Sequence, residues 1–91
     1  MAIPSFDKLL RPILNLASRE DITRQTATTA MEQELTLSPE ERERRIPSDR
    51  MTVMRNRTGW AMSFLTKGGL ISKIAPKTYR ITDAGRLALG L

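Results

Sequence analysis

The sequence of 91 residues contains no cysteine and no histidine, and it has only one tryptophan, one tyrosine and two phenylalanines. Without cysteine, neither a disulfide nor a thiolate metal site can form. Without histidine, the chain lacks the commonest general base and metal ligand, and every Ser-His or Cys-His nucleophile arrangement is excluded. We therefore expect no catalytic site, no metal centre and no cofactor in this chain.

Long apolar runs are also absent. No run approaches the roughly 18 residues of a membrane-spanning helix, and the N-terminal stretch MAIPSFDKLL has no secretory apolar region. We therefore expect a cytoplasmic protein with no membrane partner. The 40% of hydrophobic residues recur with regular spacing, which predicts one globular domain over residues 1–91.

Acidic residues are scarce in the C-terminal half. Residues 1–45 hold seven basic and eight acidic residues, for a net charge of −1. Residues 46–91 hold eight basic and two acidic residues, for a net charge of +6. A basic half of this kind is typical of a nucleic-acid binder. An anionic membrane is the weaker interpretation, because no basic amphipathic helix has a broad aromatic face.

Hydrophobic spacing and capping residues predict a mostly α chain with a small β-hairpin. The expected elements of the N-terminal half are a helix over 5–18 kinked at Pro12, a very short strand at Ile22, a helix over 24–35 capped by Thr23, and a short helix over 39–45 capped by Ser38. A long helix over 50–67, strands over 70–74 and 78–82, and a helix over 83–89 capped by Thr82 follow. We expect Leu87 and Leu89 of the last helix to face the core. This order predicts a winged helix-turn-helix fold with one extra short helix.

The long helix organises the prediction. One side carries an apolar stripe, which we expect to face the core: Val53, Met54, Trp60, Ala61, Phe64 and Leu65. Gly68 and Gly69 suit a left-handed helix end. The opposite side is polar and has no acid: Thr52, Arg55, Asn56, Gly59 and Ser63. This side predicts a recognition helix in the major groove of DNA, and the alternative is a core helix with a solvated face.

Several polar and basic residues are candidates for DNA binding. Arg55 and Asn56 can read base edges, because Arg pairs with guanine and Asn with adenine. We expect phosphate or base contacts from the residues around them and from the basic wing: Arg50, Thr52, Ser63, Lys67, Lys73, Lys77 and Arg80. The alternative for all of them is ordinary solvated surface.

Three further residues of the long helix have structural interpretations. Arg57 falls within the apolar stripe, so we expect a packed stem and a guanidinium bonded to backbone carbonyls or an acid. Trp60 is expected in the core. Gly59 costs about 1 kcal/mol of helix stability relative to Ala, which indicates a packing or close-approach position.

Three segments carry a resemblance to a known family. They are IPSFDKLLRPIL at the start, NRTGWAMSFLTKGGLI over residues 56–71, and YRITDAGRLAL over residues 79–89. Together they resemble the N-terminal domain of Mrr-type restriction endonucleases over nearly the whole chain. The resemblance implies a DNA-recognition module of a type IV restriction system, with double-stranded and modified DNA as the substrate class. In such proteins a separate C-terminal nuclease domain of the PD-(D/E)xK type cuts the DNA.

The nuclease chemistry is not encoded in this sequence. It requires clustered carboxylates for Mg²⁺ and a nearby lysine, whereas Asp83 is the only acid after Asp49 and no Glu-x-Lys occurs. We therefore expect this chain to be no enzyme, and either an excised N-terminal part or a stand-alone relative. A protein-interaction or dimerisation module, which would include a homodimer, and an RNA-binding winged helix stay open as alternative functions.

Overall fold

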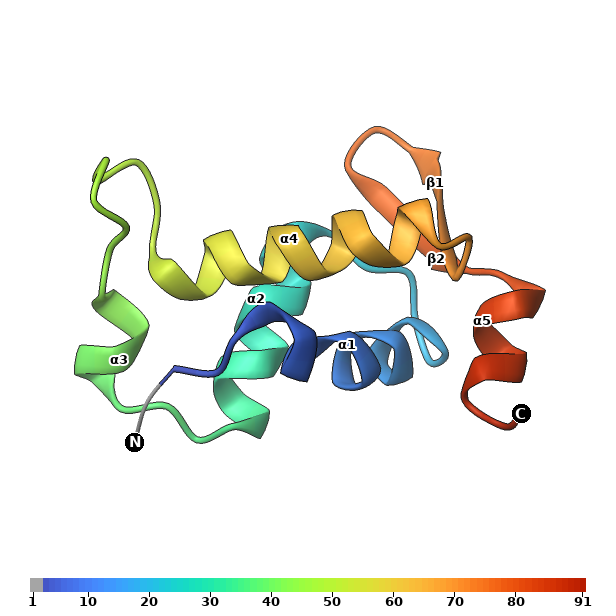
Figure 1. Cartoon of the computed structure of the whole chain (residues 1–91), viewed down its shortest axis with the longest axis horizontal. Coiled ribbons are helices and arrows are strands. Elements are labelled where there is room, and N and C mark those ends of the chain that lie inside the picture. Colours follow the sequence, from blue (N-terminus) through green and yellow to red (C-terminus); the bar gives the residue numbers. More distant parts are fainter. Residues whose placement is uncertain (1–2) are drawn as a thin grey trace.

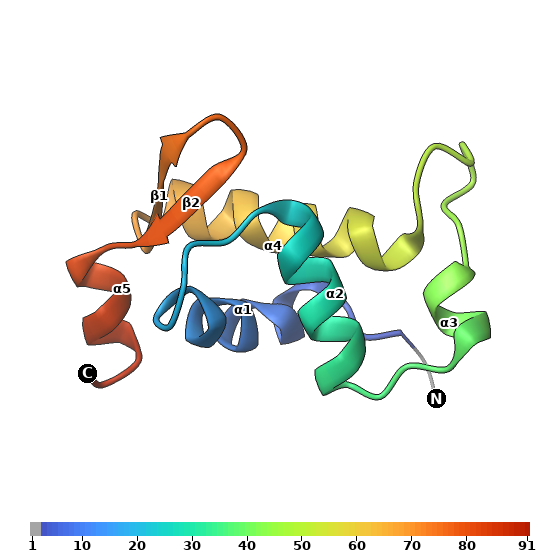
Figure 2. The ribbon, with the colours of Figure 1, turned by 180° about the vertical axis from the view of Figure 1, so that it is seen from behind.

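The structure is a computed structural model that describes residues 3–91. The described elements are η1 (Phe6–Leu9, a 3₁₀ helix), α1 (Leu10–Ala17), α2 (Arg24–Glu34), α3 (Pro39–Glu43), α4 (Val53–Lys67), β1 (Ile71–Ala75), β2 (Thr78–Ile81) and α5 (Asp83–Ala88). Helix α4 runs along the molecule, and α1 and α2 both pack against it and extend below it in the views of Figures 1 and 2. The mostly α fold with a winged-helix hairpin, predicted from the sequence, is confirmed.

Hydroxyl side chains begin the main helices as the sequence predicts. Thr23 accepts a hydrogen bond from the Thr26 backbone N–H at the start of α2, and Ser38 accepts one from Glu41 at the start of α3. Thr82 caps α5 in the same way by accepting from the Gly85 N–H. Each hydroxyl satisfies a backbone donor that the first helical turn leaves unpaired.

The boundaries differ from the prediction by more than one residue at three places. The single helix expected over 5–18 is instead the 3₁₀ helix η1 followed by α1, and Pro12 lies in the first turn of α1, where a missing N–H costs no hydrogen bond. Helix α3 ends at Glu43, because Arg44 is extended and its carbonyl accepts the Val53 N–H at 2.7 Å. Helix α4 begins at Val53 rather than at residue 50, because Thr52 is its N-cap.

The hairpin is a two-stranded antiparallel sheet. Ile71 pairs with Ile81 and Ser72 with Arg80, and an irregularity follows Lys73. Ile22 adds an isolated antiparallel bridge to Tyr79, with backbone N–H···O distances of 2.9 and 2.8 Å. The very short strand predicted at Ile22 is therefore confirmed, and it fixes the entry to α2 against the wing.

The turn after α4 positions the hairpin. Gly68 stays right-handed, whereas Gly69 has a φ of +75°. The Leu70 N–H bonds the Leu65 carbonyl at 2.9 Å and the Gly69 N–H bonds the Thr66 carbonyl at 3.0 Å, which is the Schellman arrangement. Of the two glycines expected to suit a left-handed helix end, only Gly69 is left-handed.

The core lies between α4, α1, α2 and the base of the hairpin. Its largest fully buried side chains are Leu9, Ile13, Ile22, Met31, Met54, Ile71 and Thr58. Leu89 packs against this core at its edge. Leu87, expected to face the core, is 74% exposed. The expectation is wrong because Gly85 brings the other side of α5 against the backbone of Leu70.

Two projections flank the outward side of α4. At its N-terminal end, residues 44–52 form a loop closed by an Arg45–Thr52 bridge and by an ion pair between Arg45 Nε and Asp49 Oδ1 at 2.6 Å. At its C-terminal end stands the hairpin. Both projections rise beyond α4 on the same side in Figures 1 and 2. The outward side of α4 therefore lies between them.

Candidate nucleic-acid interface

The rotation of α4 about its own axis decides which of its side chains face the core and which are exposed to a ligand. Its buried residues are Met54, Thr58, Ala61, Met62 and Leu65. At 100° per residue, the centre of this set lies about 75° from the centre of the apolar stripe predicted from the sequence. The prediction is correct for Met54, Ala61 and Leu65, and it is wrong for Trp60 and Phe64, which are 62% and 57% exposed.

The predicted core position of Trp60 is therefore corrected. Two helices pack against α4, so its inner face consists of small or flexible side chains such as Ala61 and Met62 that allow close approach. The aromatic rings lie beside this face. Phe64 packs on Phe6 of η1, with ring centroids 5.9 Å apart, and Trp60 projects outward.

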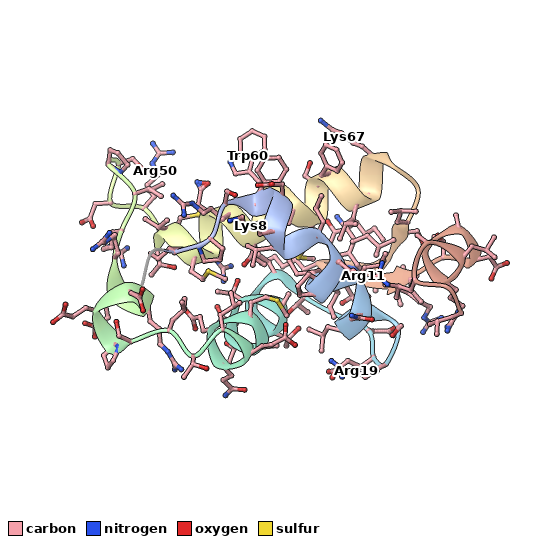
Figure 3. The ribbon with its side chains drawn as sticks, turned by 60° about the horizontal axis from the view of Figure 1, so that its bottom comes forward. Lys8, Arg11, Arg19, Arg50, Trp60 and Lys67 are labelled. Carbon is pink, nitrogen blue, oxygen red and sulfur yellow. The ribbon has the colours of Figure 1, made fainter. Side chains whose placement is uncertain are left out.

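An outward stripe of four residues runs along α4, and we name it the α4 stripe: Asn56, Trp60, Ser63 and Lys67. Their spacing of four, three and four residues keeps them on one side of a helix. Asn56 is half-buried, whereas Ser63 and Lys67 are exposed. Figure 3 shows Trp60, Lys67 and Arg50 along one edge of the molecule, opposite Arg19.

Arg24 is a member of this surface that the sequence analysis missed. It is the first residue of α2, and its side chain lies across α4: Nε donates to the Arg55 carbonyl at 3.1 Å, and Nη2 lies 3.3 Å from the Met51 sulfur. The guanidinium occupies the space over Gly59, where a Cβ atom would come within 3.0 Å of it. In the sequence, Arg24 lies in the N-terminal half, whose net charge is −1. The only signal near it is the Thr23 cap, which predicts that Arg24 begins a helix.

Arg55, the predicted base reader, extends toward α2. Its Nη1 donates to Gln25 Oε1 at 2.6 Å. The pKa of Arg24 is lowered by burial and, to a smaller extent, by the neighbouring Arg55 cation. Among residues 3–91, neither arginine forms an ion pair with a carboxylate. Two cations, of which Arg24 is partly desolvated, thus lie together at the start of α2.

Two open hollows meet at Arg24 and Tyr79. The first measures about 310 Å³ and is lined by Arg24, Gly59, Met62, Ser63, Thr66, Lys67 and Tyr79. The second measures about 490 Å³ and is lined by Thr23, Arg24, Gln25, Arg55, Lys77 and Tyr79. The fold thus brings four predicted site residues, Arg55, Ser63, Lys67 and Lys77, together with Arg24. We name this surface the basic face.

Five other predicted residues lie outside the two hollows, and one of them, Asn56, belongs to the α4 stripe. Arg80 forms a two-fold ion pair with Asp21, with both N···O distances at 2.9 Å, and this pair raises the pKa of Arg80 and lowers that of Asp21. Lys73 is exposed on β1, and Arg50 is exposed in the 44–52 loop. Thr52 accepts the Arg55 N–H as the N-cap of α4, a bond that the sequence analysis did not predict.

Arg57 has the hydrogen bonding expected of a structural arginine. Its Nη1 donates to the Ile3 carbonyl at 2.7 Å and to the Pro4 carbonyl at 3.0 Å. The side chain is partly buried. Arg57 therefore ties the N-terminal segment to α4 and is turned away from the basic face.

The sequence of the chain matches one protein family over residues 6–90, and that family is described as the Mrr N-terminal domain. The match covers nearly the whole chain. The chain belongs to the Mrr N-terminal domain family. The resemblance drawn from three segments of the sequence is thereby confirmed, and this Mrr N-terminal domain is associated with restriction systems. No curated protein and no solved structure matches it.

The Mrr N-terminal domain is not itself an enzymatic domain. Within residues 3–91, no three His, Cys, Asp or Glu side chains gather closely enough to hold a metal ion. In the same range, no helix is both long and apolar enough to cross a membrane.

Proposed function

We propose that this Mrr N-terminal domain binds double-stranded DNA through the basic face. The observation that carries the proposal is the meeting of Arg24 and Arg55 with Lys67 and Lys77 around two hollows. These cations come from α2, α4 and the hairpin tip, and the two arginines have no carboxylate partner among the described residues. A polyanion would supply the missing counter-charge.

In the proposed complex, the α4 stripe enters the major groove, whose width of about 12 Å admits one helix. Asn56 and Ser63 are then near base edges. Arg24 lies where the two hollows meet and Lys77 lines the second hollow, so both cations would contact phosphates beside the groove. Arg80 is left out, because its guanidinium already pairs with Asp21.

The restriction-system association gives the proposal its biological setting. A recognition domain of such a system would act on double-stranded DNA, modified DNA included, in the cytoplasm, and the cutting chemistry would be supplied by a nuclease domain. RNA is the less suitable ligand, because the major groove of A-form RNA is too deep and narrow for a helix to read.

Fluorescence anisotropy with matched labelled duplexes tests this function. A duplex DNA of about 20 base pairs and the RNA duplex of the same sequence are titrated with the domain at equal ionic strength. We expect DNA to bind more tightly than RNA. Equal affinity for both, or no binding to either, would contradict the proposal, and the second result would favour a protein-interaction module.

A further inference from the structure

Trp60 is an exposed aromatic side chain on α4, with the exposed Phe64 one turn further along the helix and polar and basic residues on its other side. Its neighbours along the α4 stripe are Asn56, Ser63 and Lys67. The indole is 62% exposed, and it borders a shallow hollow together with Arg24, Gly59 and Ser63. The largest apolar side chain of the domain thus lies at the margin of the basic face.

The fold does not require this indole. The core is closed by Met54, Ala61 and Leu65 on the inner face of α4, and Phe64 has an aromatic neighbour in Phe6. At 62% exposure, Trp60 retains more than half of its area for a ligand, and its N–H can donate a hydrogen bond at the same time. Trp60 is therefore positioned to contribute to binding rather than to folding.

The surroundings of Trp60 restrict the chemistry of its ligand. The side chains that share its hollow or its stripe are cationic or neutral: Arg24, Asn56, Ser63 and Lys67. The matching ligand is anionic overall and apolar where it meets the indole. On the base edges of the major groove, the apolar group is the C5-methyl of thymine. A cytosine methylated at C5 carries the same group at the same place.

We infer that Trp60 packs against the C5-methyl group of a pyrimidine in the major groove and so helps to set sequence specificity. The inference rests on the proposed function, because it needs α4 to lie in that groove. It adds an apolar reader to the hydrogen-bonding side chains of the α4 stripe. Burial of one methyl group strengthens binding about fourfold.

The domain carries its own probe for this contact, because Trp60 is the only tryptophan of the chain. Duplexes are first selected for binding from a random library that contains thymine and 5-methylcytosine. One selected duplex is then synthesised in matched forms, with uracil for thymine or with cytosine for 5-methylcytosine. Affinity and Trp60 emission are measured for each form.

We expect one of the two replacements to weaken binding about fourfold and to reduce the change in Trp60 emission. A response to uracil identifies thymine as the source of the methyl group, and a response to cytosine identifies 5-methylcytosine. Trp60→Ala should bind the methylated and unmethylated forms equally. Leu87→Ala, which removes another exposed apolar side chain on α5, should keep the discrimination.

The remaining outcomes overturn the inference in distinguishable ways. Duplex binding with a strong salt dependence but no response to either methyl group would overturn the role of Trp60 alone and leave the proposed function standing. A larger emission change with single-stranded than with duplex DNA would indicate stacking on unpaired bases instead. Failure to bind any duplex would remove both proposals together.

Discussion

The guanidinium of Arg24 lies over Gly59, and the absence of a side chain at Gly59 is what makes room for it. A Cβ atom at residue 59 would come within 3.0 Å of three atoms of this guanidinium. Arg24 is fixed there by its hydrogen bond to the Arg55 carbonyl at 3.1 Å. A glycine in mid-helix and a cation from another helix therefore form one unit of the basic face.

Gly59→Ala tests this unit. The substitution adds up to about 1 kcal/mol of helix stability, but it displaces the Arg24 guanidinium and its hydrogen bond. We expect a melting temperature within a few degrees of the wild type and a clear loss of affinity for duplex DNA. In a domain that already carries Arg24→Ala, Gly59→Ala should raise the melting temperature without further loss of affinity. An unchanged affinity for the single variant would show that Arg24 is not needed at this position.

Arg24→Ala should weaken binding to duplex DNA roughly tenfold at low salt, because it removes a charge-assisted contact. The slope of log K against log salt should become less steep by about one, as expected for one lost phosphate contact. Arg19→Ala is the matched control, since Arg19 is exposed on the opposite edge of the molecule (Figure 3). Equal losses for the two variants would argue against a localised binding face.

Arg57→Ala should act on stability and not on DNA binding. The variant leaves the carbonyls of Ile3 and Pro4 without their donor, which should cost about 1–3 kcal/mol. A domain of this size would then melt several degrees lower, and calorimetry or circular dichroism can measure the shift. If the variant melts like the wild type but loses affinity for DNA, Arg57 belongs to the interface instead.

Thr58→Val should stabilise the domain. Thr58 is fully buried on α4, and its hydroxyl oxygen has no hydrogen-bond partner among the described residues. Exchanging this hydroxyl for a methyl group removes an unsatisfied polar atom, which is worth about 1 kcal/mol and a few degrees of melting temperature. Thr66→Val is the contrast, because the Thr66 hydroxyl donates to the Met62 carbonyl at 2.7 Å. A lower melting temperature for Thr58→Val would mean that its hydroxyl is satisfied after all.

The sequence predicts best the features that depend on neighbouring residues. Helix starts at Thr23, Ser38 and Thr82 follow from side chains that bond a backbone N–H three residues away. The end of α4 follows from Gly69, which tolerates a positive φ. The family also follows from local segments, and it is confirmed over residues 6–90.

The features that the sequence does not predict depend on distant partners. The rotation of α4 is set by two helices that pack on its inner face, and periodicity assigned its large aromatic residues to that face instead. Arg24 and Arg55 meet across 31 residues, and Arg80 meets Asp21 across 59 residues. Charge counted along the chain cannot tell a paired arginine from an unpaired one. The basic face is therefore visible only after folding.

The central claim is that the basic face binds the phosphates of duplex DNA, and the salt dependence of binding tests it most directly. The affinity of the wild-type domain for one duplex is measured between about 50 and 200 mM salt. With roughly four to six phosphate contacts, log K against log salt should fall with a slope of about −4 to −5. A slope near zero would contradict the claim, because binding would then release no counterions.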